Sequence, residues 1–135
     1  MRKITIFVLA LVCMLGLAAC TGRNLRFDID VASSINIKSG LTGDEINITD
    51  KEIIQSITQD INSLRFEKTS ESDGKVGYVY MVKWFDADGK QMESITITEE
   101  NGYQISYGGD FYKVGADLCI DVTLINEMLD ITAEE

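Results

Sequence analysis

The chain has 135 residues, with 12 Lys and Arg against 22 Asp and Glu, no His, no Pro and a formal net charge of −10. This length is enough for one ordinary domain with its own hydrophobic core. The acidic balance argues against binding along nucleic-acid backbones, because that binding needs Lys and Arg to displace counterions. A chain without His also lacks the usual catalytic triads and most zinc sites.

The N-terminal stretch has the pattern of a secretory signal. Two basic residues precede the almost wholly apolar run 4–19, and Cys20 follows it directly. A charged start, a short apolar run and small residues before the cleavage point are typical of a signal peptide. A Cys in this place is typical of a bacterial lipoprotein signal. Sixteen residues are fewer than the roughly 20 that a membrane span needs. The predicted cleavage motif is Leu17, Ala18 and Ala19.

Cleavage after residue 19 would make Cys20 the lipidated N-terminus, because its thiolate is the nucleophile that takes a diacylglyceryl group. Two acyl chains anchor a protein stably, at about 0.8 kcal/mol per buried CH₂. The remaining chain has 10 basic and 22 acidic residues, a net charge of −12, which anionic headgroups repel. We therefore expect a lipid-anchored monomer on the outer face of the cell membrane, with 20–25 as the lipidated Cys and a short tether.

The first half of the remaining chain predicts strands and then a helix. Residues 26–31 alternate polar and apolar, which indicates a half-buried strand. Residues 34–49 read as a β-hairpin with a turn-rich loop. Helix 50–64 should follow, with Thr49 as its cap and Glu52 completing a capping box. Its polar side carries Gln55, Gln59 and Asn62, and its apolar stripe consists of Ile53, Ile57, Ile61 and Leu64.

The second half predicts a four-stranded meander over about 76–114, preceded by a surface loop at 67–75. Its turns are expected at 86–89, at Asn101-Gly102, which is the strongest two-residue hairpin signal of the chain, and at 108–110. Asp121 can cap a last, short helix at 122–130. The predicted fold class of the single domain 26–135 is α+β: an antiparallel sheet, made of the hairpin and the meander, with the main helix on one face.

Five aromatic residues are the candidate binding surface. The strand at 76–85 is apolar on both faces, which is usual for a central strand covered on both sides. If the second cover is missing, the aromatic side chains would form an exposed patch of the kind that marks binding sites. Both alternatives, core and patch, stay open for Tyr78, Tyr80, Trp84, Tyr103 and Tyr107.

Other chemistry has weaker signals. Asp86-Ala87-Asp88-Gly89 resembles the start of a calcium loop, but Ile97 stands where the loop needs Glu, so we interpret it as a turn with at most weak cation binding. Carboxylates for acid–base catalysis could come from Asp28, Asp30, Glu99 and Glu100, but nothing in the sequence pairs them. Cys119, between Leu118 and Ile120, is expected to be a small buried residue. We predict no metal, no cofactor and no catalytic residue.

Six segments carry a resemblance to a known family: 11–20, 46–51, 62–68, 84–90, 109–112 and 120–126. In these segments the chain resembles a family of small, uncharacterised lipoproteins of Gram-positive anaerobic bacteria. The similarity covers most of the chain and is most specific in the signal. It implies a membrane-attached extracytoplasmic domain of unknown function and supplies no catalytic residues.

Three functions are consistent with the sequence. The first is a non-enzymatic module that binds a cell-envelope protein. The second is an acidic immunity- or inhibitor-like protein that masks a basic partner through its charge. The third, a carboxylate-dependent hydrolase, would require two carboxylates that face each other across a cleft.

Overall fold

The computed structural model describes residues 24–71, 77–115 and 119–133. The signal 1–19, with Leu17, Ala18 and Ala19, and Cys20 lie outside these residues, so the predictions about them stay predictions. The elements in chain order are β1 (Asn24–Leu25), β2 (Ser34–Ser39), β3 (Glu45–Ile48), α2 (Lys51–Ser63), β4 (Phe66–Glu71), β5 (Tyr80–Phe85), β6 (Gln91–Ile97), β7 (Gln104–Tyr107), β8 (Asp110–Val114) and α3 (Val122–Ala133).

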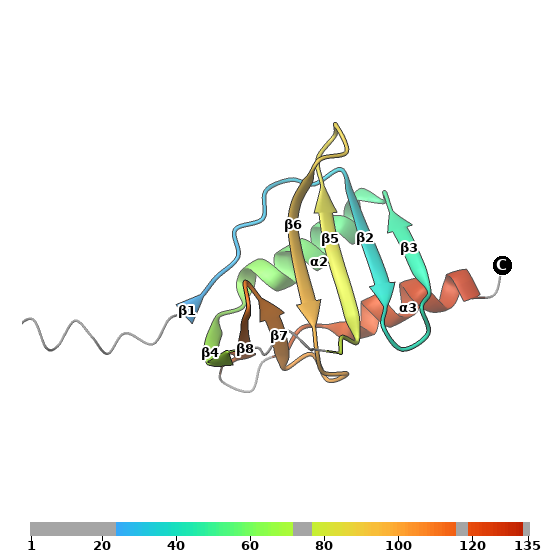
Figure 1. Cartoon of the computed structure of the whole chain (residues 1–135). Coiled ribbons are helices and arrows are strands. Elements are labelled where there is room, and N and C mark those ends of the chain that lie inside the picture. Colours follow the sequence, from blue (N-terminus) through green and yellow to red (C-terminus); the bar gives the residue numbers. More distant parts are fainter. Residues whose placement is uncertain (1–23, 72–76, 116–118, 134–135) are drawn as a thin grey trace, which may run out of the picture.

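The strands form one eight-stranded sheet in the order β1-β4-β8-β7-β6-β5-β2-β3 (Figure 1). Every neighbouring pair is antiparallel. The predicted α+β class with an antiparallel sheet is confirmed. Both helices lie on the same side of the sheet, and no described element covers the opposite face (Figure 1).

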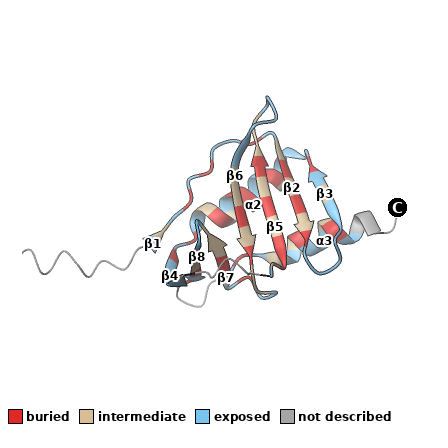
Figure 2. Ribbon diagram, in the orientation of Figure 1, coloured by how far each residue is buried: buried red, intermediate tan, exposed pale blue. Residues whose placement is uncertain are grey.

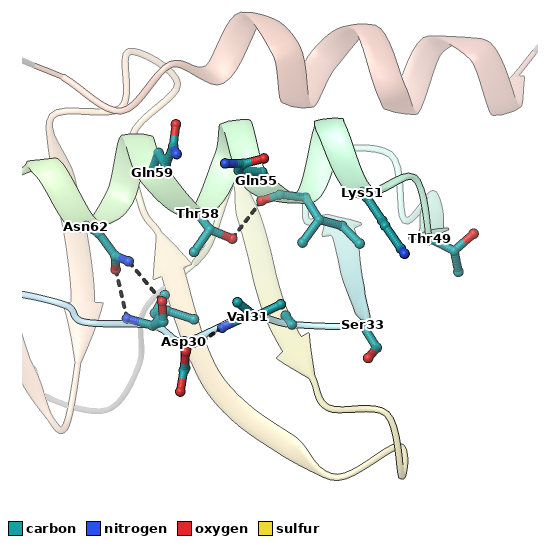
Figure 3. A pocket seen from close by; sticks show the side chains of 12 residues that line it. Asp30, Val31, Ser33, Thr49, Lys51, Gln55, Thr58, Gln59 and Asn62 are labelled. Atoms are coloured by element: carbon teal, nitrogen blue, oxygen red, sulfur yellow. Dashed lines mark hydrogen bonds between the residues drawn. The ribbon is translucent and has the colours of Figure 1, made fainter.

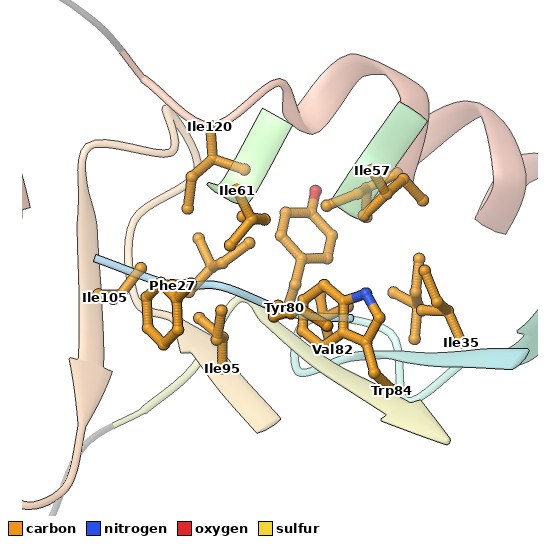
Figure 4. Packing of buried hydrophobic residues seen from close by; sticks show 14 of the residues in the cluster. Phe27, Ile35, Ile57, Ile61, Tyr80, Val82, Trp84, Ile95, Ile105 and Ile120 are labelled. Carbon is orange, nitrogen blue, oxygen red and sulfur yellow. The ribbon is translucent and has the colours of Figure 1, made fainter. Parts of the chain in front are cut away.

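Burial alternates along the central strands, because successive side chains of a strand point to opposite faces. In β5, Val82 and Trp84 face the helices and are buried, whereas Met81 and Lys83 face the open side and are half-buried. The strand accordingly alternates between buried and intermediate residues along its length (Figure 2). The core is therefore a single layer between the sheet and the two helices, and it is closed by isoleucines from both sides (Figure 4).

The N-cap of α2 lies one residue later than predicted. The Asp50 carboxylate, not Thr49, accepts the backbone N–H groups of Glu52 (2.9 Å) and Ile53 (3.2 Å). Asp and Thr are both good N-caps, and their order along the chain does not say which carboxylate or hydroxyl reaches the free amides. Of the predicted apolar stripe, Ile57, Ile61 and Leu64 are buried, whereas Ile53 is half-buried and its neighbour Ile54 is buried.

The segment predicted as a loop at 67–75 is largely a strand as far as it is described. β4 pairs with β8 on one side and with β1 on the other. Its Glu-Lys-Thr-Ser-Glu sequence has no apolar alternation, so its pairing comes from backbone hydrogen bonds and from the buried Phe66 at its start. A bulge between Lys68 and Ser70 shifts the register, and Lys68 forms a 3.0 Å ion pair with Asp110.

The tight two-residue turn is not at Asn101-Gly102. It lies at Gly108-Gly109, where both residues have positive φ (58° and 85°) and Tyr107 pairs directly with Asp110. Such a turn needs φ > 0 at both central positions, which glycine adopts at no steric cost. Asn101-Gly102 instead belongs to the longer connection between β6 and β7.

Candidate functional site

The five candidate aromatic residues do not form one exposed patch. Trp84 is fully buried and Tyr80 is 6% exposed, and both lie in the core between sheet and helices (Figure 4). Tyr78 and Tyr107 are half-buried, and only Tyr103 is substantially exposed, at 39%. The helices cover the face of β5 that carries Tyr80 and Trp84, so the core alternative holds for these two residues.

The polar atoms of the two buried aromatic side chains, Trp84 and Tyr80, both form hydrogen bonds. The Trp84 indole Nε1 donates to the Thr58 hydroxyl on α2 (3.0 Å), which donates to the Ile54 carbonyl (2.6 Å). The Tyr80 hydroxyl donates to the Asn126 side chain on α3. Burial raises the pKa of Tyr80 above its usual value of 10.0. These bonds connect both helices to β5.

Tyr107 occupies the other end of the core. Its ring contacts Phe27 edge-on, with centroids 5.0 Å apart, and its hydroxyl donates to Glu93 (3.2 Å). Burial and the neighbouring Glu93 carboxylate raise the pKa of Tyr107, so its hydroxyl stays protonated at neutral pH. Phe27 also packs edge-on against Phe66, at 5.5 Å. This cluster fixes the start of the segment that leads from β1 to β2.

The acidic turn at 86–89 is closed by hydrogen bonds to one of its own carboxylates. The Asp86 carboxylate accepts the backbone N–H groups of Asp88 and Lys90, both at 2.9 Å, as expected for a turn. Within the described ranges, no group of three or more His, Cys, Asp or Glu side chains is placed to hold a metal ion. Cys119 is exposed, contrary to expectation, because it precedes α3 instead of facing the core.

A groove of about 680 Å³ is the candidate site, and the sequence did not predict it. It lies between α2 and the extended run 29–33 and is lined by that run, by Thr49 and by one side of α2 (Figure 3). The buried residues Ala32, Ile54 and Thr58 contribute to its lining.

The run 29–33 is held at two points and belongs to no strand. The Asn62 side chain on α2 accepts the N–H of Ile29 and donates to its carbonyl, both at 2.9 Å (Figure 3). At the other end, the Ser33 N–H donates to the Phe85 carbonyl (2.8 Å). Between these points the predicted alternation breaks, since Val31 is 90% exposed and Ala32 is buried. Residues 26–31, which we expected to form a strand, belong to none, and the run 29–33 is extended chain beside the helix.

Several polar groups of the lining are free. The side chains of Ser33, Thr49, Lys51, Gln55 and Gln59 form no hydrogen bond or ion pair with another residue of the described part of the chain. Both glutamines lie on the side of the helix that the periodicity had marked as polar. Sequence reasoning missed the groove because its second wall comes from a segment whose position depends on Asn62, 33 residues away from Ile29.

No family model matches the chain, and no curated protein or solved structure matches it either. Neither helix in the described ranges combines the length and the apolar character that a membrane crossing requires. The functional argument therefore depends on the site itself.

Proposed function

We propose that the protein is a membrane-anchored extracytoplasmic lipoprotein whose domain is a non-enzymatic binding module. In this proposal the hairpin and the four-stranded meander, with the main helix on one face, form a scaffold for the groove between α2 and the run 29–33. A lipid on Cys20 holds the scaffold at the outer face of the cell membrane, where its partner is a cell-envelope protein.

The groove lining is the observation that carries the proposal. It combines an apolar floor with amides, hydroxyls, one amine (Lys51) and one carboxylate (Asp30). Convergent polar groups over an apolar floor are typical of ligand sites. Hydrolysis by paired carboxylates needs two acids about 5–9.5 Å apart, and of the candidate acids Asp28, Asp30, Glu99 and Glu100 only Asp30 lines the groove. The arrangement favours binding over that chemistry.

The start of β1 supports close attachment to the membrane. Asn24 pairs with Glu67, and only four positions separate Asn24 from Cys20. Four residues of fully extended chain span at most about 14 Å. A lipid on Cys20 would therefore keep the domain next to the bilayer surface.

Lipid attachment is tested with Cys20→Ala and a radiolabelled fatty acid in the native host. We expect the variant to lose the label, because residue 20 then has no thiolate to take the diacylglyceryl group. Cys119→Ala is the control and should keep the label. Equal label in the Cys20 variant would contradict the anchor.

Binding in the groove is tested by site-specific photocrosslinking in cells. We place p-benzoylphenylalanine at Gln59, in the groove, or at Thr96, which pairs with Met81 on the open sheet face. The proposal predicts a discrete covalent adduct from position 59 and none from position 96. Adducts from position 96 alone would place the binding surface on the sheet and contradict the proposal.

A further inference from the structure

We propose that the groove binds the C-terminal end of an extended polypeptide, with the terminal carboxylate at the Lys51 end. This inference rests on the proposed function, in which the groove is the binding site, and it names the class of ligand. Three features of the lining support it: its charges, its free amides and its apolar floor.

The charges of the lining select a carboxylate and set its direction. Lys51 extends from the first turn of α2 toward the run 29–33, and the free hydroxyl-bearing residues Ser33 and Thr49 lie at the same end of the groove (Figure 3). The described part of the chain has one ion pair, between Lys68 and Asp110, so the Lys51 ammonium is not neutralised there.

Asp30 is the only acid of the lining and lies nearer the Asn62 end of the groove (Figure 3). An ammonium beside hydroxyl donors binds a carboxylate through charge-assisted hydrogen bonds. A carboxylate near Asp30 would be repelled. The ligand therefore ends at Lys51, and its preceding residues extend toward Asp30.

The free amides suit a peptide backbone. Gln55 and Gln59 are one helical turn apart on α2, exposed and without a hydrogen bond to any described residue. Each amide offers both a donor and an acceptor, as a peptide bond does. On the other wall, the backbone N–H groups of Asp30 and Ala32 donate to no described residue. Donors two residues apart in an extended run match the spacing of an added strand.

The apolar part of the groove sets the size of the ligand. Ile29, Ala32 and Ile54 are buried in the lining, while Val31 at the groove is 90% exposed. A groove of about 680 Å³ is in the range of sites for small ligands. It therefore accommodates a few residues with small apolar side chains, and a folded partner would enter it through an extended segment.

The experiment compares three peptides on the full-length, lipidated protein in nanodiscs by isothermal titration calorimetry. The first is acetyl-Ala-Val-Ala-Val-Ala with a free C-terminal carboxylate, and the second is its C-terminal amide. The third is the amide with an N-terminal succinyl group, which carries the same charge at the wrong end. We expect the free acid to bind about tenfold more tightly than either amide, the worth of one charge-assisted hydrogen bond.

Variants assign this preference to one side chain. Lys51→Met should abolish the advantage of the free acid, whereas Lys51→Arg should keep it. Lys90→Met is the matched control, because Lys90 is exposed in the turn before β6, away from the groove lining, and it should change nothing. Thermal melting of each variant confirms that it is folded.

The other outcomes overturn the inference in distinguishable ways. Equal binding of the acid and its amide would rule out carboxylate capture, and equal binding of the succinyl peptide would show unspecific attraction of anions. If no peptide binds while position 59 still crosslinks in cells, the ligand class is wrong and the groove remains the binding site. If neither peptide binding nor crosslinking occurs, the proposed function fails as well.

Discussion

The two walls of the groove are built in different ways. Helix α2 satisfies its own backbone, is capped by Asp50 and presses an isoleucine stripe onto the sheet. The run 29–33 has no ladder of its own and is held by the Asn62 side chain and by the Ser33–Phe85 backbone bond. The helical wall therefore forms hydrogen bonds within its own backbone, whereas the position of the run 29–33 depends on its contacts with α2 and β5. A wall that depends on few contacts is also the one that can adjust to a ligand.

The largest loss of stability is expected from Ile57→Asp, on the buried side of α2. Ile57 is buried in the core, and an unpaired carboxylate there should cost on the order of 4 kcal/mol, enough to unfold much of the protein. Thermal melting followed by circular dichroism measures the loss. Gln55→Asp, on the exposed side of the same helix, is the control and should melt close to the wild type. An unchanged melting temperature for Ile57→Asp would show that the stripe is not core.

Asn62→Ala should release the run 29–33 from α2 and leave the helix in place. It removes both partners of Ile29 at a partly buried site, which should cost about 1–2 kcal/mol in urea unfolding. Amide hydrogen exchange should accelerate at Ile29 while α2 stays protected. Gln59→Ala, which removes a free side chain from the same helix, should alter neither quantity. Equal loss of protection along α2 would mean that the two walls are one cooperative unit.

Asp50→Ala should destabilise the first turn of α2. The substitution leaves the amides of Glu52 and Ile53 without their acceptor, and the loss of an N-cap costs about 1 kcal/mol. Asp50→Ser should restore most of this stability, because a serine hydroxyl caps as well as a carboxylate does. If alanine and serine behave alike in urea unfolding, the cap does not stabilise α2.

The smallest effect concerns Asp60, which joins α2 to the start of α3. Its carboxylate accepts the Asp121 N–H (2.9 Å), and burial raises the pKa of Asp60 above its ordinary value of 3.8. The charged form is therefore the less favourable one in the folded state, and the contribution of Asp60 to stability should fall as the pH rises from 3.8 through the raised pKa.

The comparison of wild type with Asp60→Asn isolates this effect. The variant cannot ionise at position 60, so its melting temperature relative to the wild type should be higher at about pH 7 than at about pH 4. A difference that is the same at both values would show that residue 60 does not contribute to the pH dependence.

Much of the scaffold follows from local patterns. The alternation in 34–49 predicted the hairpin of β2 and β3, and the isoleucine spacing predicted α2 within one residue at each end. Asp121, whose carboxylate accepts the Thr123 N–H (3.0 Å), marks the start of α3 as predicted. These patterns are reliable because neighbours two to four residues apart decide which side of an element is buried.

The misplaced predictions share one cause. β4 lacks an apolar alternation and is a strand only because β8 and β1 lie beside it. Tyr80 and Trp84 are core residues because the helices cover their face of β5, and Val31 is exposed because the run 29–33 crosses beside α2 without joining a sheet. Each outcome depends on residues far away in the sequence.

The sequence by itself determined the acidic balance, the predicted signal and anchor, the α+β class and the isoleucine stripe of α2, because composition and short-range periodicity express them directly. Only the tertiary structure decided which aromatic residues are buried and where a ligand can enter. The groove exists because Asn62 holds Ile29 across 33 positions of chain. Such a contact leaves no periodic trace, since neither residue has a neighbour in sequence that reveals its partner.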